Sequence, residues 1–138
     1  MSPVLLDTSC IVALLDRSER CHRRCVEAVT NLEATLVTCE AVIAESCYLM
    51  RTTTGAVDAI LANVDRGVFQ IPFRLTDSMK RARSLLRRYS KVPMDFADAC
   101  LVCIANELKT GRILTLDRDF EVYRWHRNRS FEMLIALD

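Results

Sequence analysis

The sequence predicts one α/β domain over residues 1–138, with a mostly parallel sheet of about four to five strands and helices on both faces. The chain has 138 residues, the length of one ordinary domain. Its 51% hydrophobic and 27% charged residues are typical of a globular protein with a buried core. Short apolar runs alternate with longer segments of helical periodicity, a pattern that favours a parallel sheet covered by helices.

Five short apolar runs are the expected strands. The run VLLD leads directly into a polar Thr-Ser pair, which indicates a buried strand that runs into a helix. The run ILTLD near the other end of the chain has the same form, an apolar strand closed by an acid. The expected strands span residues 4–7, 35–37, 69–73, 113–116 and 131–136.

The remaining segments carry helix signals. Thr38 is a suitable N-cap for a helix over residues 39–51. Pro93 interrupts the chain, and Asp95 is placed to cap a long helix that continues to about Lys109 before Gly111. The other expected helices span residues 10–15, 19–32, 56–64, 77–89 and 119–125.

Composition excludes several classes of protein. The net charge of +1 does not identify a nucleic-acid binder, although basic residues cluster at 80–91 and 124–129. An odd number of cysteines, seven, together with the lack of a secretory signal argues against a disulfide framework. Cys100 and Cys103 lie in the apolar run ACLVCIA, where they are expected to pack a helix. No apolar stretch reaches the roughly 18 residues of a membrane span, so we expect a cytoplasmic protein with no membrane association.

Four acids carry the functional signal, because each lies inside or at the end of an apolar run. They are Asp7, Glu45, Asp98 and Asp117. A buried carboxylate costs several kcal/mol unless it is paired, protonated or bound to a cation. Four around one cleft would repel by roughly 4 kcal/mol for each pair at about 4 Å. Mg²⁺ or Mn²⁺ would remove that repulsion, so the pattern predicts that the four converge on a divalent-metal site.

Each acid also has a structural interpretation. Asp7 could be a helix N-cap, but Thr8 or Ser9 could fill that position, which favours a functional role for Asp7. Glu45 lies alongside Val42 and Leu49 on a face that looks apolar, about 100° from the polar stripe of its helix. A carboxylate on such a face needs a partner.

Two of the positions have a neighbouring acid that could share or exchange roles with them. Asp95 is the expected helix cap three residues before Asp98, and Asp119 could cap the short helix that follows Asp117. We favour Asp98 over Asp95 for the metal site because Asp98 directly begins the apolar run DACLVCIA. For the other pair, either Asp117 or Asp119 is open as the direct ligand.

With these motifs the chain resembles the PIN-domain ribonucleases, in particular the VapC-type toxins of toxin–antitoxin pairs. The similarity rests on LLDTSCIVALL, on Glu45 and on FADACLVCIANELKTGRILTLDRDF, and it covers essentially the whole chain. It implies that Asp7, Glu45, Asp98 and Asp117 are the catalytic, metal-binding acids and that Ser9 supports the site. It further implies an RNA substrate, Mg²⁺ or Mn²⁺ as cofactor, a homodimer and an inhibitory antitoxin as partner.

The resulting hypothesis is a divalent-metal-dependent ribonuclease in which a cluster of acids activates water to hydrolyse a phosphodiester. Asp119 would bind through water or replace Asp117, and Arg118 with the basic segment 77–89 would hold the RNA backbone. Two alternatives stay open: a binding module of the same fold without catalysis, and an RNA-processing nuclease that is not a toxin. Phosphatases of the haloacid dehalogenase type need a second Asp where this chain has Ser9.

Overall fold

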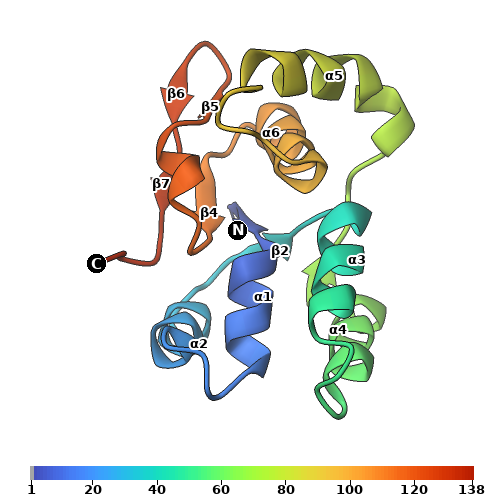
Figure 1. The fold of residues 1–138 in the computed structure, drawn as a ribbon, viewed down its shortest axis with the longest axis vertical. Coiled ribbons are helices and arrows are strands. Elements are labelled where there is room, and N and C mark those ends of the chain that lie inside the picture. The colour runs from blue at the N-terminus through green and yellow to red at the C-terminus, as the bar shows by residue number, and fades with distance from the viewer. Residues whose placement is uncertain (1) are drawn as a thin grey trace.

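A five-stranded parallel sheet forms the centre of the computed structural model, which describes residues 2–138 (Figure 1). Its spatial order is β3-β2-β1-β4-β7, and every neighbouring pair is parallel. The predicted α/β class with a parallel sheet of four to five strands is therefore confirmed. The strands are β1 (Pro3–Leu6), β2 (Thr35–Val37), β3 (Phe69–Gln70), β4 (Arg112–Leu114) and β7 (Glu132–Met133).

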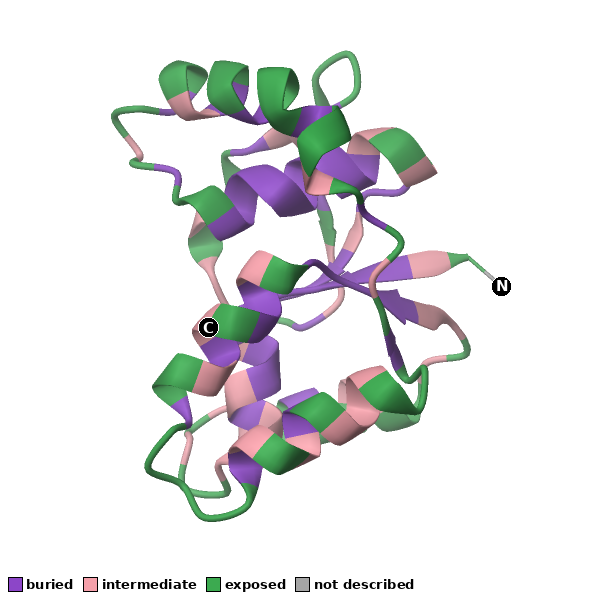
Figure 2. Cartoon of the chain, turned by 90° about the vertical axis from the view of Figure 1, so that its right-hand side faces the viewer, coloured by how far each residue is buried: buried purple, intermediate pink, exposed green. Residues whose placement is uncertain are grey.

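Helices cover both faces of the sheet, as predicted (Figures 1 and 2). The chain extends the sheet from β1 to β3 in one direction and then returns past β1 to form β4. Because parallel crossovers are right-handed, this reversal places the earlier helices on one face and the later ones on the other. The helices are α1 (Thr8–Leu15), α2 (His22–Thr30), α3 (Glu40–Leu49) and α4 (Ala56–Asp65) on the first face, with α5 (Met79–Arg88) and α6 (Phe96–Leu108) on the second.

The core lies where β1 and α6 meet. Val4, Leu5 and Leu6 of β1 are fully buried, as expected for a central strand covered on both faces. Every residue of α6 from Ala97 to Ala105 is buried as well, including Cys100 and Cys103, and Figure 2 shows buried residues along this helix and the strands. None of the helices within residues 2–138 is long and apolar enough to cross a bilayer.

Two predicted helix starts were wrong. The helix expected from residue 19 begins at His22, because Glu19 instead accepts a hydrogen bond from the main-chain nitrogen of Cys21 at 2.6 Å. Thr38 does not cap α3, which has Cys39 at that position. The Thr38 hydroxyl donates to the main-chain oxygen of Leu6 at 2.8 Å, so it ties β2 to β1 inside the core.

The C-terminal region is less regular than predicted. The helix expected at residues 119–125 is a 3₁₀ turn, η2 (Arg118–Glu121), followed by strand β5 (Arg124–Trp125). Strand β5 pairs antiparallel with β6 (Arg129–Ser130), outside the main sheet. Packing overrides the local helical pattern here, because Phe120 and Tyr123 are fully buried in edge-on contact with centroids 5.0 Å apart. The helix expected from residue 77 likewise divides into a 3₁₀ turn, η1 (Leu75–Ser78), and α5.

Gly111, between α6 and β4, is expected to tolerate no side chain. A Cβ at this position would lie within 2.9 Å of three atoms of the Trp125 indole. The indole nitrogen donates to the main-chain oxygen of Ser130 at 3.1 Å, so a shift of the ring would break that hydrogen bond. We predict that Gly111→Ala destabilises the fold by roughly 1–3 kcal/mol and changes the emission of Trp125, the single tryptophan of the chain.

Thermal unfolding and fluorescence would measure both effects. Gly67→Ala is the control for the fluorescence, because a Cβ there meets no atom within 4 Å and so does not displace Trp125, although its positive φ of 77° adds local strain. Unchanged Trp125 emission in Gly111→Ala would contradict the packing described.

Candidate functional site

An acidic pocket opens at the edge of the sheet where β1 and β4 end. The direction of strand addition reverses between these two strands, the position at which open α/β sheets bind ligands. The pocket has a volume of about 230 Å³. Five of its lining residues are acids, and they come from four separate parts of the chain. It is lined by Asp7, Thr8, Ser9, Glu45, Leu49, Asp95, Asp98 and Asp117.

Asp7 is both the N-cap of α1 and part of the pocket wall. Its Oδ1 accepts from the main-chain nitrogen of Thr8 at 2.8 Å, while Oδ2 accepts from Ser9 Oγ at 3.0 Å and from Thr115 Oγ1 at 2.6 Å. Of the residues that the sequence left open for this cap, Asp7 is therefore the one that fills it, and not Thr8 or Ser9. Burial raises the pKa of Asp7 to about 6, against the effect of these three hydrogen bonds and with a further rise from Asp117.

Ser9 and Thr115 connect the ends of the two central strands. Ser9 Oγ accepts from the main-chain nitrogen of Leu116 at 2.9 Å, and Thr115 Oγ1 accepts from that of Asp117 at 3.0 Å. The loop after β4 is thereby fixed against Asp7. The sequence argument missed Thr115, which is fully buried in the structure. Its position inside the apolar run ILTL was a usable signal, because a buried hydroxyl needs a hydrogen-bond partner.

Asp98 is buried at the start of α6, with 5% of its surface exposed. Asp95 caps this helix as predicted, and its Oδ1 accepts from the main-chain nitrogen of Asp98 at 2.8 Å. Burial raises the pKa of Asp98 to about 8, and the neighbouring charges of Asp95, Asp7 and Asp117 add to the shift. This carboxyl therefore has a high cost of ionisation when no cation is present.

Tyr123 holds Asp98 in place. Its buried hydroxyl donates to Asp98 Oδ2 at 2.9 Å, which opposes the rise in the pKa of Asp98. Burial, together with the charge of Asp98, raises the pKa of Tyr123 itself, so the phenol remains a donor. The ring packs edge-on against Tyr89 at 5.1 Å. Nothing in the sequence pattern pointed to Tyr123, because only the fold brings the residue that follows η2 against Asp98 of α6.

The sequence left open that Asp119 caps the turn and that only Asp117 lines the pocket, but Asp117 does both. Asp117 is the cap of η2, accepting from the main-chain nitrogen of Asp119 at 2.9 Å, and it also lines the pocket. Asp119 lies outside the lining, and the expectation that it caps the turn was wrong. Slight burial and the charges of Asp117 and Asp95 raise the pKa of Asp119.

Glu45 reaches the pocket from α3. It is half-buried, and Leu49, one helical turn further, is 52% exposed and lines the same pocket. Of the face that looked apolar in the sequence, Val42 is therefore part of the core, whereas Glu45 and Leu49 form a wall of the pocket. The structure thus brings together Asp7, Ser9, Glu45, Asp95, Asp98 and Asp117, and leaves Asp119 at the margin.

The donors fit a hard divalent cation in their chemistry. Five carboxylates line the pocket, and such ions prefer carboxylate oxygens. Thr8 Oγ1 is, within residues 2–138, the buried side-chain oxygen that has no hydrogen-bond partner, and Thr8 belongs to the same lining. In that part of the chain no three His, Cys, Asp or Glu side chains are grouped closely enough to hold an ion as they lie. An ion held by one or two carboxylates with water as its other ligands is compatible with this arrangement.

Comparison with known proteins agrees with this fold. The family model of the PIN domain matches residues 4–125. The chain belongs to the PIN domain family. It is 30% identical over 117 residues to ribonuclease VapC26 of Mycobacterium tuberculosis, covering 83% of this chain and 87% of that protein. The predicted resemblance to VapC-type PIN proteins is confirmed.

A solved structure has the same fold. The crystal structure of Mycobacterium tuberculosis VapC20, described as a sarcin-ricin loop cleaving toxin, superposes on this PIN domain with a TM-score of 0.79. The match covers 86% of this chain and 93% of that one, at 20% sequence identity.

Neutralising Asp98 is predicted to stabilise the metal-free PIN domain at high pH. Its pKa is 3.8 when unperturbed and about 8 in the fold, so between these values the folded state binds more protons than the unfolded chain. The free energy of unfolding then falls as pH rises through this window, by up to about 1.4 kcal/mol per pH unit for one proton. In Asp98→Asn this fall is removed.

Denaturant unfolding in EDTA at pH 5 and pH 8 measures the effect. Asp98→Asn should exceed the wild type in stability at pH 8, with the difference shrinking toward pH 5. Asp65→Asn, an exposed acid at the end of α4, is the control and should follow the wild type at both values. Identical pH dependence of wild type and Asp98→Asn would show that Asp98 is not buried as described.

Removing the Tyr123 hydroxyl is predicted to raise the pKa of Asp98 further, because the hydrogen bond that favours its ionised form is lost. Tyr123→Phe should also lower the free energy of unfolding by about 1 kcal/mol. Carboxyl ¹³C NMR titration of Asp98 checks the pKa, with the exposed Tyr48→Phe as matched control. An unchanged Asp98 titration in Tyr123→Phe would refute the contact.

Proposed function

We propose that this PIN protein, with residues 1–138 as one nuclease domain, is a divalent-metal-dependent ribonuclease and the toxin of a toxin–antitoxin pair. The observation that carries the proposal is the convergence of acids from four separate segments on one pocket at the switch point of the sheet. Identity of 30% to a protein named as a ribonuclease supports the same activity.

Asp7, Glu45, Asp98 and Asp117 would hold Mg²⁺ or Mn²⁺. When bound, the ion supplies Lewis acidity and charge neutralisation for the attack of water on a phosphodiester. Asp98 has a pKa of about 8, so it must release its proton to act as a ligand near neutral pH. Asp95 and Ser9 support the site by fixing the backbone of α6 and the loop after β4.

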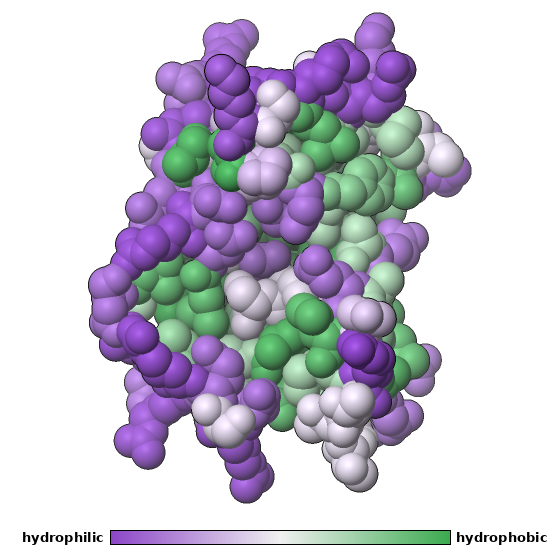
Figure 3. All heavy atoms as spheres, in the orientation of Figure 1, coloured by the Kyte–Doolittle hydropathy of each residue, from purple (hydrophilic) through white to green (hydrophobic). Residues whose placement is uncertain are grey.

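Binding of the RNA backbone would fall to the basic residues of α5. Hydrophilic side chains gather over α5 at the top of the face seen in Figure 3. The exposed cations of this helix are suited to phosphate contacts, which give affinity without sequence selection. They are Lys80, Arg81, Arg83, Arg87 and Arg88.

An antitoxin and a second copy of the chain are the proposed protein partners. Large apolar side chains lie exposed on α3 and α4, among them Tyr48 at 63%, Leu49 at 52% and Leu61 at 49%. Helices α3 and α4 pack against each other, and exposed apolar side chains gathered on adjacent helices suit a site that binds another protein. The name of VapC20 as a toxin supports the same biological class for this chain.

Cleavage of a labelled RNA by purified protein tests the activity. The wild type is expected to cut with Mg²⁺ or Mn²⁺ and to stop in excess EDTA, while Asp98→Asn loses at least about a hundredfold because a metal ligand is removed. Asp65→Asn is the charge-matched control and should cut like the wild type. Equal cleavage by Asp98→Asn, or activity that survives EDTA, contradicts the proposal.

Two further measurements separate the alternatives. A binding module without catalysis should show no rise in melting temperature with Mn²⁺ that depends on Asp98, whereas the nuclease should. An RNA-processing enzyme that is not a toxin should leave growth unaffected when expressed. The toxin should arrest growth through a route that requires Asp98.

A further inference from the structure

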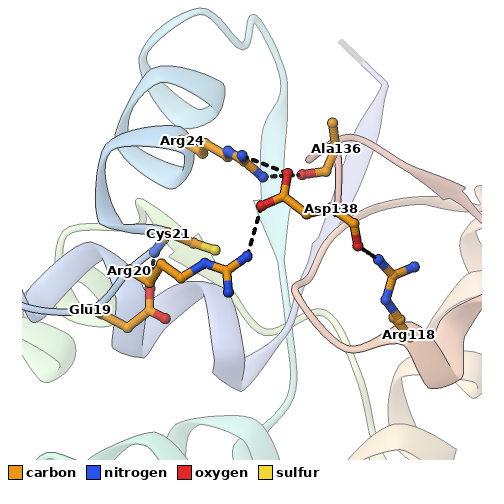
Figure 4. Close-up of polar contacts among 7 residues, drawn as sticks. All are labelled: Glu19, Arg20, Cys21, Arg24, Arg118, Ala136 and Asp138. Atoms are coloured by element: carbon orange, nitrogen blue, oxygen red, sulfur yellow. Dashed lines mark hydrogen bonds and ion pairs between the residues drawn. The ribbon is translucent and has the colours of Figure 1, made fainter.

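Three arginines converge on one aspartate outside the acidic pocket (Figure 4). Arg20 Nη2 donates to Asp138 Oδ2 at 2.7 Å, and Arg24 Nη2 donates to Asp138 Oδ1 at 2.8 Å. Arg118 donates to the main-chain oxygen of Asp138. Arg20 precedes α2, Arg24 lies within it and Arg118 lies in η2, so the fold assembles this cluster from distant parts of the chain.

The arginines surround a pocket of about 270 Å³, called here the arginine pocket. It is lined by Glu19, Arg20, Cys21, Arg24, Leu116, Arg118, Leu137 and Asp138. Two other acids are already engaged: Glu19 accepts from the main-chain nitrogen of Cys21, and Glu121 pairs with Arg118 at 3.0 Å. Arg24 also donates to the main-chain oxygen of Ala136 at 3.0 Å.

The arginine pocket and the acidic pocket lie on two sides of one short segment. Leu116 and Arg118 line the arginine pocket, whereas Asp117 between them lines the acidic pocket. The main-chain nitrogen of Leu116 donates to Ser9 Oγ, so this segment is fixed to the acidic site. A chain of phosphates with one group at the acids would therefore have a strong cationic site within reach of a neighbouring group.

The aspartate in the arginine pocket is easily displaced. The side chains of Arg20, Arg24 and Asp138 are 77%, 45% and 57% exposed, and exposed ion pairs contribute little to stability. A backbone phosphodiester carries the same single charge as a carboxylate, but its tetrahedral oxygens suit guanidinium donors that arrive from several directions. All three arginines could donate to one phosphate, whereas only Arg20 and Arg24 donate to the Asp138 side chain and Arg118 donates to its main-chain oxygen.

We propose that Arg20, Arg24 and Arg118 bind a backbone phosphate of the RNA beside the scissile bond, and that the Asp138 carboxylate occupies this place when no RNA is bound. The identity of the ligand as RNA rests on the proposed function. The convergence of the three arginines and its position beside Asp117 do not.

Binding of a fluorescent single-stranded oligoribonucleotide to the full chain in EDTA tests this site without cleavage. The double variant Arg20→Gln/Arg24→Gln should bind at least about tenfold more weakly, and the slope of log K against log salt should become shallower by about 0.7, because one phosphate contact is lost. Arg118→Gln should weaken binding independently from a different element. Asp138→Ala should bind more tightly than the wild type, because the competing carboxylate is gone.

Arg23→Gln is the matched control. Arg23 lies beside Arg24 on α2 but faces a separate surface with His22 and Val26, so its loss should change the affinity less than twofold. Thermal melts establish whether each variant folds. If the double variant does not fold, the affinity of Arg118→Gln for the RNA tests the site in its place. Any of three results would disprove the site. The first is an equal loss of RNA affinity in Arg23→Gln and in the double variant, the second is a lower affinity of Asp138→Ala than of the wild type, and the third is a wild type that does not bind the RNA.

The same data separate this inference from the proposed function. RNA binding that depends on the three arginines, without any cleavage in Mn²⁺, keeps the phosphate site and removes the nuclease. Cleavage that requires Asp98, with binding that ignores the arginines, does the reverse.

Discussion

The Asp7 carboxylate is the interaction on which the arrangement of the site depends. One side chain caps α1 and accepts hydrogen bonds from Ser9 and from Thr115, 108 residues away in sequence. The main-chain nitrogen of Asp7 also donates to Leu114 at 3.1 Å, so β1, α1 and β4 meet at this residue. The same two hydroxyls, of Ser9 and Thr115, accept hydrogen bonds from the backbone of the loop that carries Asp117 and so fix its position. Asp7 thus builds the pocket as well as lining it.

This construction has an electrostatic cost. Burial raises the pKa of Asp7 to about 6 and that of Asp98 to about 8, and neighbouring acids add to both shifts. The fold therefore favours the protonated form of these two carboxyls at pH values at which they would be ionised in water. A proton or a divalent cation relieves the repulsion, and hydrogen bonds from Thr115 and Tyr123 offset part of it. Such perturbed acids gathered in a cleft are typical of functional sites.

Charge is divided sharply across the short segment after β4. Asp117 faces the acids, while Arg118, the next residue, contributes to the arginine pocket with Arg20 and Arg24. An acidic pocket repels the phosphates of a polyanion, and cations at the neighbouring surface offset that repulsion. The net charge of +1 conceals this division, since it averages over opposite local fields.

The sequence by itself determined the class of fold, the central strands and four acids that line one pocket, because burial leaves a readable pattern. A carboxylate at the end of a buried strand, such as Asp7 or Asp117, is costly enough to be conspicuous. Helix caps were read less well: Asp95 was identified correctly, whereas the caps expected at Thr38 and Asp119 were wrong, because hydroxyls and carboxyls have several possible partners at equal local cost.

Only the tertiary structure decided the partners of those acids. Thr115 and Tyr123 touch Asp7 and Asp98 through crossovers and aromatic packing that no local pattern records. The same holds for the arginine pocket, whose three arginines lie 118, 114 and 20 residues from the aspartate that they share in space. Local physics fixes which side chains are buried, and the path of the chain fixes which of them meet.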